Sequence, residues 1–213
     1  YIYTGLAPPG GISVATYVDA ARAAFQKWED VPSSYMDFFY RGETAAYAPD
    51  LLDGRNVVGF TEGSPLEFLA YTTYWESGGH LIETDIIMNR NMSWSAETPT
   101  PFRAYDLHTT LLHEAGHTLS LDDVYDTRYS DQVMYGYLHN GEMRRELQDG
   151  DIAGITFIYP KEGDLVVPDV RGPLSAIEYE TIELSATIRN AGQRATSSFR
   201  EQLTFYPLSS YRA

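Results

Sequence analysis

The feature that most constrains this chain of 213 residues is the stretch from His113 to Asp123, which has the pattern H-E-x-x-H-x-x-S-x-x-D. Residues four apart on a helix share a face, so His113 and His117 can direct both imidazoles at one metal ion. Glu114 follows the first histidine and can reach a water molecule on that metal. The sequence therefore predicts a helix with a metal site on one face.

A third ligand is expected from the residues after the helix. Asp123 lies ten residues past His113, and a straight helix would carry it about 15 Å along the axis, too far to bind the same ion. The chain must therefore turn after Leu119 and come back if Asp123 is to be a ligand. A carboxylate oxygen is an accepted zinc ligand. The neighbouring Asp122 stays open as an alternative.

The composition limits which residues can bind a metal and which partners are expected. The chain has no cysteine, so a zinc ion must be held by histidine and carboxylate groups. The net charge of −15 argues against nucleic acid and anionic membranes as partners. The acidity is interpreted as a solvated surface. No apolar run approaches the length of a transmembrane helix, and 43% hydrophobic residues are enough for a packed core.

The context of the motif points to a family. The segment from Ser130 to Gly136 places Met134 in a turn-prone stretch after the motif. This combination resembles the metzincin clan of zinc endopeptidases, and within it the matrixins. The segments Tyr17–Asp30, Asp53–Phe60 and Gly78–Asn89 resemble the matrixin first helix, third strand and fifth strand, and the stretch around Asp151 resembles its last helix. There are two departures, because this chain has Ser120 where glycine is usual and Asp123 where animal matrixins have histidine.

The resemblance implies an α+β fold over residues 1–160. It has a twisted, mostly parallel five-stranded sheet with one antiparallel edge strand, and three helices. It also implies that Met134 forms the hydrophobic base under the zinc ligands. A peptide substrate would pair with the edge strand in Phe68–Trp75. The implied substrate-binding residues are Leu69, Ala70 and Tyr71 on that strand, Thr109 and Thr110 on the zinc helix, and Gly136, Tyr137 and Leu138 after the methionine.

Local patterns predict the individual elements. Ser13 can cap the first helix, whose apolar face is Ala20, Ala21, Ala24, Phe25 and Trp28. The predicted strands are Tyr1–Leu6, Met36–Tyr40, Asn56–Phe60, Phe68–Trp75 and His80–Asn89. The segment Asn91–Pro101 is predicted to be a loop. Two further helices are predicted, at Tyr105–Leu119 and Gln148–Tyr159.

The sequence changes character after Pro160. Lys161–Asp164 reads as a linker, and residues 161–213 form a second region rich in predicted strands. These strands are Leu165–Val170, Ile182–Ile188 and Phe199–Tyr206, with a turn at Asn190–Gly192. The region resembles the start of a bacterial cell-adhesion-related, immunoglobulin-like β-domain. Such sandwiches need about 100 residues, so we predict a partial β-sandwich-like segment.

The remaining histidines and acids carry weaker predictions. His80 and Asp85 do not match the spacing of the structural zinc site of animal matrixins, so no structural zinc is expected. His108 and His139 are expected to be surface or hydrogen-bonded residues. Asp122, Asp126 and Asp131 could bind calcium, although an ordinary acidic loop is favoured.

The functional expectation is a secreted zinc endopeptidase that hydrolyses peptide bonds with a metal-activated water and Glu114 as general base. The expected partners are protein or peptide substrates, and the expected state is a monomer. The alternative is a catalytically weak zinc-binding adhesion or binding protein of the cell surface.

Overall fold

The computed structural model describes residues 1–62, 68–161, 165–173 and 181–190. The chain divides into two compact units, Tyr1–Pro160 and Lys161–Ala213, which are described separately here. In the described part of the chain, no helix is both long enough and apolar enough to cross a membrane.

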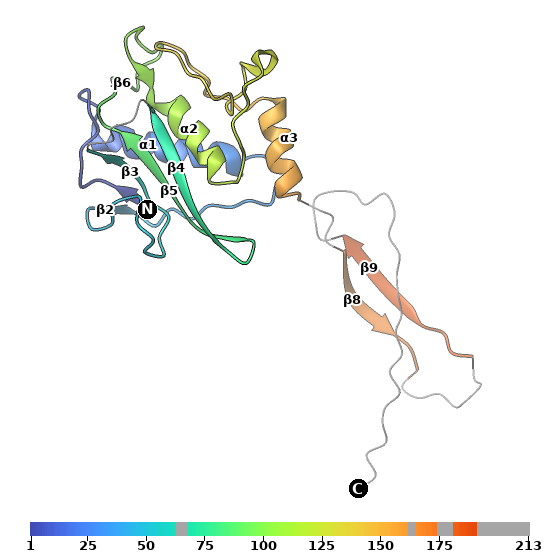
Figure 1. The fold of residues 1–213 in the computed structure, drawn as a ribbon. Coiled ribbons are helices and arrows are strands. Elements are labelled where there is room, and N and C mark those ends of the chain that lie inside the picture. Colours follow the sequence, from blue (N-terminus) through green and yellow to red (C-terminus); the bar gives the residue numbers. More distant parts are fainter. Residues whose placement is uncertain (63–67, 162–164, 174–180, 191–213) are drawn as a thin grey trace. The chain divides into compact units, whose positions relative to one another are not determined.

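The first unit is built on a five-stranded sheet (Figure 1). Its strands are β1 (Ile2–Tyr3), β2 (Glu43–Thr44), β3 (Val58–Thr61), β4 (Ala70–Ser77) and β5 (His80–Asn89), in the order β2-β1-β3-β5-β4. All neighbours pair in parallel except β4, which runs antiparallel to β5 at the edge of the sheet. This arrangement confirms the predicted sheet, including its antiparallel edge strand.

Three α-helices accompany the sheet: α1 (Val14–Glu29), α2 (Leu107–His117) and α3 (Asp149–Ile158). Ser13 caps α1 as predicted, because its side chain accepts a hydrogen bond from the backbone N–H of Thr16. The ring of Trp28 is fully buried and donates from Nε1 to the carbonyl of Leu112 in α2, at 2.9 Å. The Tyr17 hydroxyl donates to the carbonyl of Val58, at 3.0 Å. Helix α1 is therefore fixed both to α2 and to the sheet.

The prediction of a strand at Met36–Tyr40 is wrong. Met36 and Phe38 are half-buried while Phe39 is exposed, so the alternation in the sequence is real. This stretch has no neighbouring strand, however, and the pairing with β1 is made by Glu43–Thr44 instead. Alternation indicates an extended chain, but a strand also needs a hydrogen-bonding partner.

The segment predicted as the loop Asn91–Pro101 contains a short strand, β6 (Trp94–Ser95). It pairs in parallel with β7 (Tyr105–Asp106), directly before α2. A short 3₁₀ helix, η1 (Thr127–Tyr129), lies in the loop after the histidine motif. Strands of two residues are too short to show an alternating pattern, so β6 and β7 could not be predicted from the sequence.

The second unit contains β8 (Leu165–Arg171) and β9 (Ser185–Asn190), which pair antiparallel. They coincide with two of the three predicted strands. The third predicted strand, Phe199–Tyr206, lies outside the described residues, as do residues 191 and 192 of the predicted turn. The likeness to an immunoglobulin-like domain therefore stays a prediction.

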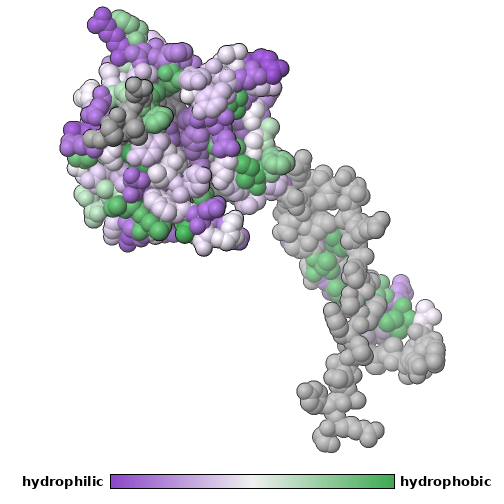
Figure 2. All heavy atoms as spheres, in the orientation of Figure 1, coloured by the Kyte–Doolittle hydropathy of each residue, from purple (hydrophilic) through white to green (hydrophobic). Residues whose placement is uncertain are grey.

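The surface of the first unit agrees with the acidic composition. Figure 2 shows hydrophilic residues over much of the displayed face, with smaller groups of hydrophobic residues between them. Most of the buried hydrophobic residues form one cluster, which includes Trp28 of α1, Phe60 of the sheet, Leu111 of α2 and Met134. The histidine-bearing helix α2 is thus part of the core and has a fixed position.

Candidate metal centre

Helix α2 places the two motif histidines on one face. Its first turn is capped by Asp106, whose side chain accepts a hydrogen bond from the backbone N–H of Thr109, at 2.7 Å. His113 and His117 are four positions apart, and their rings lie edge to face with centroids 4.7 Å apart. The helix ends at His117, so the second histidine is its last residue.

The chain reverses directly after the helix. Ser120 has a φ of 62°, in the left-handed region that non-glycine residues rarely adopt. The backbone N–H of Leu121 donates back to the carbonyl of Gly116, at 3.3 Å, which is a common way to end a helix. Ser120 therefore makes a left-handed turn of the kind that glycine adopts most readily, and the turn brings Asp123 back to the histidines.

Three potential metal-binding atoms converge at this point. Oδ1 of Asp123 lies 3.1 Å from Nε2 of His113 and 3.6 Å from Nε2 of His117. These three residues offer ligand atoms within 4.8 Å of one another, and they are the one such group of three or more among the described residues. Asp122 is exposed and does not belong to the group. The structure thus places Asp123, rather than Asp122, beside both imidazoles.

The hydrogen bonds around the group leave its inner atoms free to bind a cation. Nδ1 of His113 lies 2.7 Å from the carbonyl of Val133, and Nδ1 of His117 lies 2.7 Å from the carbonyl of Leu121. A carbonyl only accepts, so each Nδ1 must carry the proton, and in the neutral rings Nε2 presents a lone pair. Oδ1 of Asp123 is buried and has no hydrogen-bond partner. Three lone pairs facing one point fit Zn²⁺, which takes nitrogen and oxygen ligands in this way.

The ionisable groups of the three candidate ligands influence one another. Burial lowers the pKa of His113, but the carboxylate of Asp123 beside it, the charge of Glu114 and the carbonyl of Val133 outweigh this effect, so the pKa is raised overall. The His113 side chain in turn lowers the pKa of Asp123. The phenol of Tyr125 donates to Oδ2 of Asp123, at 2.8 Å, and fixes the carboxylate from its other side. Sequence reasoning did not identify this contact.

Glu114 lies next to the three candidate ligands and is only 5% exposed. Burial raises the pKa of its carboxyl, and the nearby His113, His117 and Thr72 only partly oppose this. The Thr72 hydroxyl donates to Oε2 at 2.8 Å. A carboxyl group with a raised pKa is suited to taking up and returning a proton near neutral pH.

Met134 packs directly beneath the helix. A Cβ at Gly116 would collide with Sδ of Met134 and approach Trp28 to 2.9 Å, so only glycine allows this close contact. The backbone N–H groups of Val133 and Met134 donate to the carboxylate of Asp151, at 2.9 and 3.0 Å. Asp151 therefore holds the segment whose carbonyl orients His113, a role that the sequence did not reveal.

A cleft of about 1280 Å³ runs beside the candidate metal centre. It is bordered by the edge strand β4, by α2 and by the segment after Met134. All of the residues predicted to bind substrate line it: Leu69, Ala70, Tyr71, Thr109, Thr110, Gly136, Tyr137 and Leu138. Tyr125 and Tyr137 pack edge to face at its rim, with ring centroids 5.4 Å apart.

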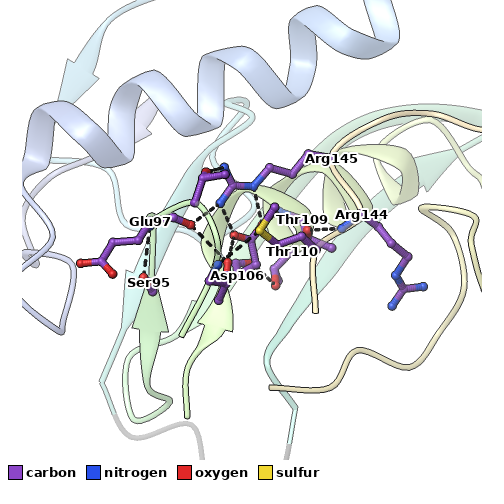
Figure 3. A network of polar contacts seen from close by, with 10 residues as sticks. Ser95, Glu97, Asp106, Thr109, Thr110, Arg144 and Arg145 are labelled. Carbon is purple, nitrogen blue, oxygen red and sulfur yellow. Dashed lines mark hydrogen bonds and ion pairs between the residues drawn. The ribbon is translucent and has the colours of Figure 1, made fainter. Parts of the chain in front are cut away.

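Two arginines that sequence reasoning missed hold the segments around the start of α2 (Figure 3). The backbone N–H of Arg144 donates to the hydroxyl of Thr109, at 2.8 Å. Its guanidinium donates to the carbonyls of Gln132 and Tyr135, at 3.0 and 3.1 Å, and to the carbonyl of Tyr137. Arg144 thereby joins the start of α2 to the segment that walls the cleft.

Arg145 anchors the other side of the helix start. It forms an ion pair with the fully buried Asp106, which also accepts a hydrogen bond from the Thr100 hydroxyl, at 2.6 Å (Figure 3). Burial raises the pKa of Asp106, but Arg145, Thr100 and Thr109 together hold it below its ordinary value. The Thr110 hydroxyl donates to the carbonyl of Asp106, at 3.1 Å. The hydroxyls of Thr109 and Thr110 are thus both engaged within the protein.

The other candidate residues lie away from this centre. His80 is exposed, and the buried carboxylate of Asp85 accepts the backbone N–H groups of Asp50 and Val57, at 2.7 and 2.8 Å. Asp126 caps η1 and forms an ion pair with Arg128, at 2.6 Å. Burial and Arg145 lower the pKa of the half-buried His108. The structure brings none of these side chains to the three candidate ligands.

Comparison with known proteins agrees with this geometry. A search of curated proteins gave no match. The family model described as Matrixin matches residues 7–160, which include strands β2 to β5 of the sheet, the three helices and the histidine motif. This chain therefore belongs to the matrixin family of zinc metallopeptidases.

Proposed function

We propose that this protein is a secreted zinc endopeptidase, with zinc held by His113, His117 and Asp123. The observation that carries the proposal is the convergence of three lone pairs beside a buried glutamate in a cleft. Membership of the matrixin family supports the same chemistry. The substrate is a protein or peptide, and the working form is a monomer.

The edge strand supplies the means of binding an extended peptide. Strand β4 has β5 on one side only, so its other edge carries backbone groups that can pair with a further strand. A peptide added there gains main-chain hydrogen bonds, while pockets select its side chains. The segment Gly136–Leu138, held by Arg144, would contact the side chain after the cleaved bond.

Glu114 acts as general base and then as general acid. When bound, zinc activates a water molecule and polarises the carbonyl of the scissile bond. Glu114 accepts a proton from the attacking water and delivers it to the leaving amine. Burial raises the pKa of this carboxyl, which suits a group that accepts a proton and then returns it.

The experiment is casein zymography of the purified protein, with and without a metal chelator. Cleavage that the chelator abolishes and added zinc restores supports a zinc endopeptidase. The matched variant is Glu114→Ala, which should retain zinc and the fold but lose at least about 10²-fold in rate. A wild-type protein that binds zinc without cleaving casein or peptides would favour a binding protein of the cell surface and contradict the proposal.

A further inference from the structure

We propose that Thr72 is a positioning residue for Glu114, and that its hydroxyl fixes which carboxylate oxygen faces the cleft. This inference deepens the proposed peptidase function and rests on it. It assigns a role to a strand residue that neither the motif nor the family match singles out.

The hydrogen bond between Thr72 and Glu114 is short and largely buried. Oγ1 of Thr72 lies 2.8 Å from Oε2 of Glu114 and 3.1 Å from the backbone carbonyl of the same residue. Within the described residues, Thr72 provides the one hydrogen bond to this carboxylate. Because Glu114 is only 5% exposed, water competes weakly for the bond. The bond occupies Oε2 and leaves Oε1 as the oxygen available to a reacting water.

The position of Thr72 follows from the pleat of β4. Successive side chains on a strand point to opposite faces, so Thr72 and Thr73 lie on different faces of the sheet. Thr72 is on the side of α2 and reaches Glu114, whereas the Thr73 hydroxyl is buried without a hydrogen-bond partner. The two neighbouring threonines therefore form a natural pair for a controlled comparison.

The arrangement links substrate binding to catalysis. Thr72 follows directly after Leu69, Ala70 and Tyr71, the residues at the start of β4 that are proposed to bind the peptide. The strand that positions the scissile bond would then also position the base that acts on it. Sharing one rigid element fixes both in a single geometry, and displacements of about 1 Å in such sites can cost 10²-fold in rate.

The first test compares Thr72→Val, Thr72→Ser and Thr73→Val in peptide hydrolysis by the zinc-loaded protein. Thr72→Val should lower kcat by about 10-fold or more with little change in KM, because the base is misplaced while binding is kept. Thr72→Ser should recover most of the rate, since it restores the hydroxyl. Thr73→Val should leave the rate unchanged. A Thr72→Val protein with full zinc content and wild-type kcat would overturn the proposal.

A double-mutant cycle separates positioning through Glu114 from a general effect on the strand. If Thr72 acts through the carboxylate, Thr72→Val should cost far less rate in a Glu114→Ala background. An equal fold-loss in both backgrounds would refute the proposal.

The same cycle measured by urea unfolding tests the contact without relying on peptidase activity. Thr72→Val should lower the unfolding midpoint more when Glu114 is present than when it is alanine. Equal shifts would show that the contact does not form. An inactive wild type with clear coupling in unfolding would refute the peptidase function and, with it, the catalytic role of Thr72, while leaving the contact itself established.

Discussion

Asp151→Ala should weaken the protein more than other single substitutions of an acidic residue on α3. Asp151 is 2% exposed, and its carboxylate accepts three backbone hydrogen bonds. The donors are Val133 at 2.9 Å, Met134 at 3.0 Å and Gln148 at 2.8 Å. Alanine removes all three acceptor contacts at once and leaves a space at the start of the helix.

The magnitude follows from the donors left behind. Each buried N–H without a partner costs about 1–3 kcal/mol, and the bonds from Val133 and Met134 are both buried. The partly buried bond from Gln148 belongs to the capping box of α3, whose loss costs about 1 kcal/mol. Water entering the space recovers some of this. We therefore expect the free energy of unfolding to fall by about 3–5 kcal/mol.

The effect should extend to the metal centre. The carbonyl of Val133 accepts the hydrogen bond from Nδ1 of His113, so loosening this segment frees the imidazole to rotate. Loss of such outer contacts typically costs 10–100-fold in metal affinity, and we expect a drop of about 10-fold. Zinc affinity is measured by competition with a chromophoric chelator, under conditions where the variant is folded.

Urea denaturation of the zinc-free protein gives the stability change, and Asp149→Ala is the control. Asp149 lies in the first turn of the same helix but is exposed. Its removal should cost only about 0.3–1 kcal/mol through the helix dipole. If Asp151→Ala proves no more destabilising than Asp149→Ala, the buried carboxylate does not hold the Met134 segment and this reasoning fails.

Three further predictions concern the ligand set, pH and the second unit. Asp123→Ala should strongly reduce zinc content measured by elemental analysis, whereas Asp122→Ala should not; the opposite result would move the third ligand. Burial raises the pKa of Asp85 to about 6 in the folded protein. The contribution of this carboxyl to folding stability is therefore fully present below its pKa in the unfolded chain, near 4, and is lost as the pH rises through 6. Urea unfolding at pH 4.5 and 7.5 should therefore show a larger advantage of Asp85 over Asp85→Asn at the lower pH, and a larger advantage at the higher pH would contradict this. A chain ending at Pro160 should still bind zinc and cleave small peptides; folding without cleavage would show that residues 161–213 contribute to the site.

Local signals in the sequence were enough to predict most of the first unit. The cap at Ser13 and the apolar face around Trp28 are features of neighbouring residues, and both occur as expected. The sheet followed from the family resemblance, and strand His80–Asn89 has the predicted bounds. The error at Met36–Tyr40 arose because alternation reports an extended chain and does not report whether another strand lies beside it.

Some residues of the candidate site could be predicted from the sequence and others could not. The spacing of the two histidines and the glutamate between them lie within a few consecutive residues, so they can be recognised in a single sequence. The contacts of Thr72 with Glu114, of Arg144 with Thr109 and of Asp151 with Val133 join residues 18 to 42 positions apart, and no periodic pattern encodes such pairs. Asp106 was the exception that could have been found, because an aspartate directly before a helix is a recognised cap signal.

The acidic residues of the chain are not all on its surface. We interpreted the charge of −15 as a solvated surface, yet Glu83, Asp85, Asp106, Glu114 and Asp151 are all buried. A buried carboxylate is tolerated when donors satisfy it, and Asp106 has an arginine, a hydroxyl and a backbone N–H.

Glu114 differs from these structural acids in the number of its partners. Among the residues that the structure describes, one hydrogen bond reaches its carboxylate, from Thr72, and its pKa is raised by burial, whereas the pKa of Asp106 is held below its ordinary value despite burial. The pKa values of two buried acids, one capping α2 and one within it, are thus shifted in opposite directions by their surroundings, as expected where one carboxylate is structural and another is catalytic. We expect the hydroxyl of Thr72 to orient the Glu114 carboxylate without satisfying it, which would leave this carboxylate able to take a proton from water.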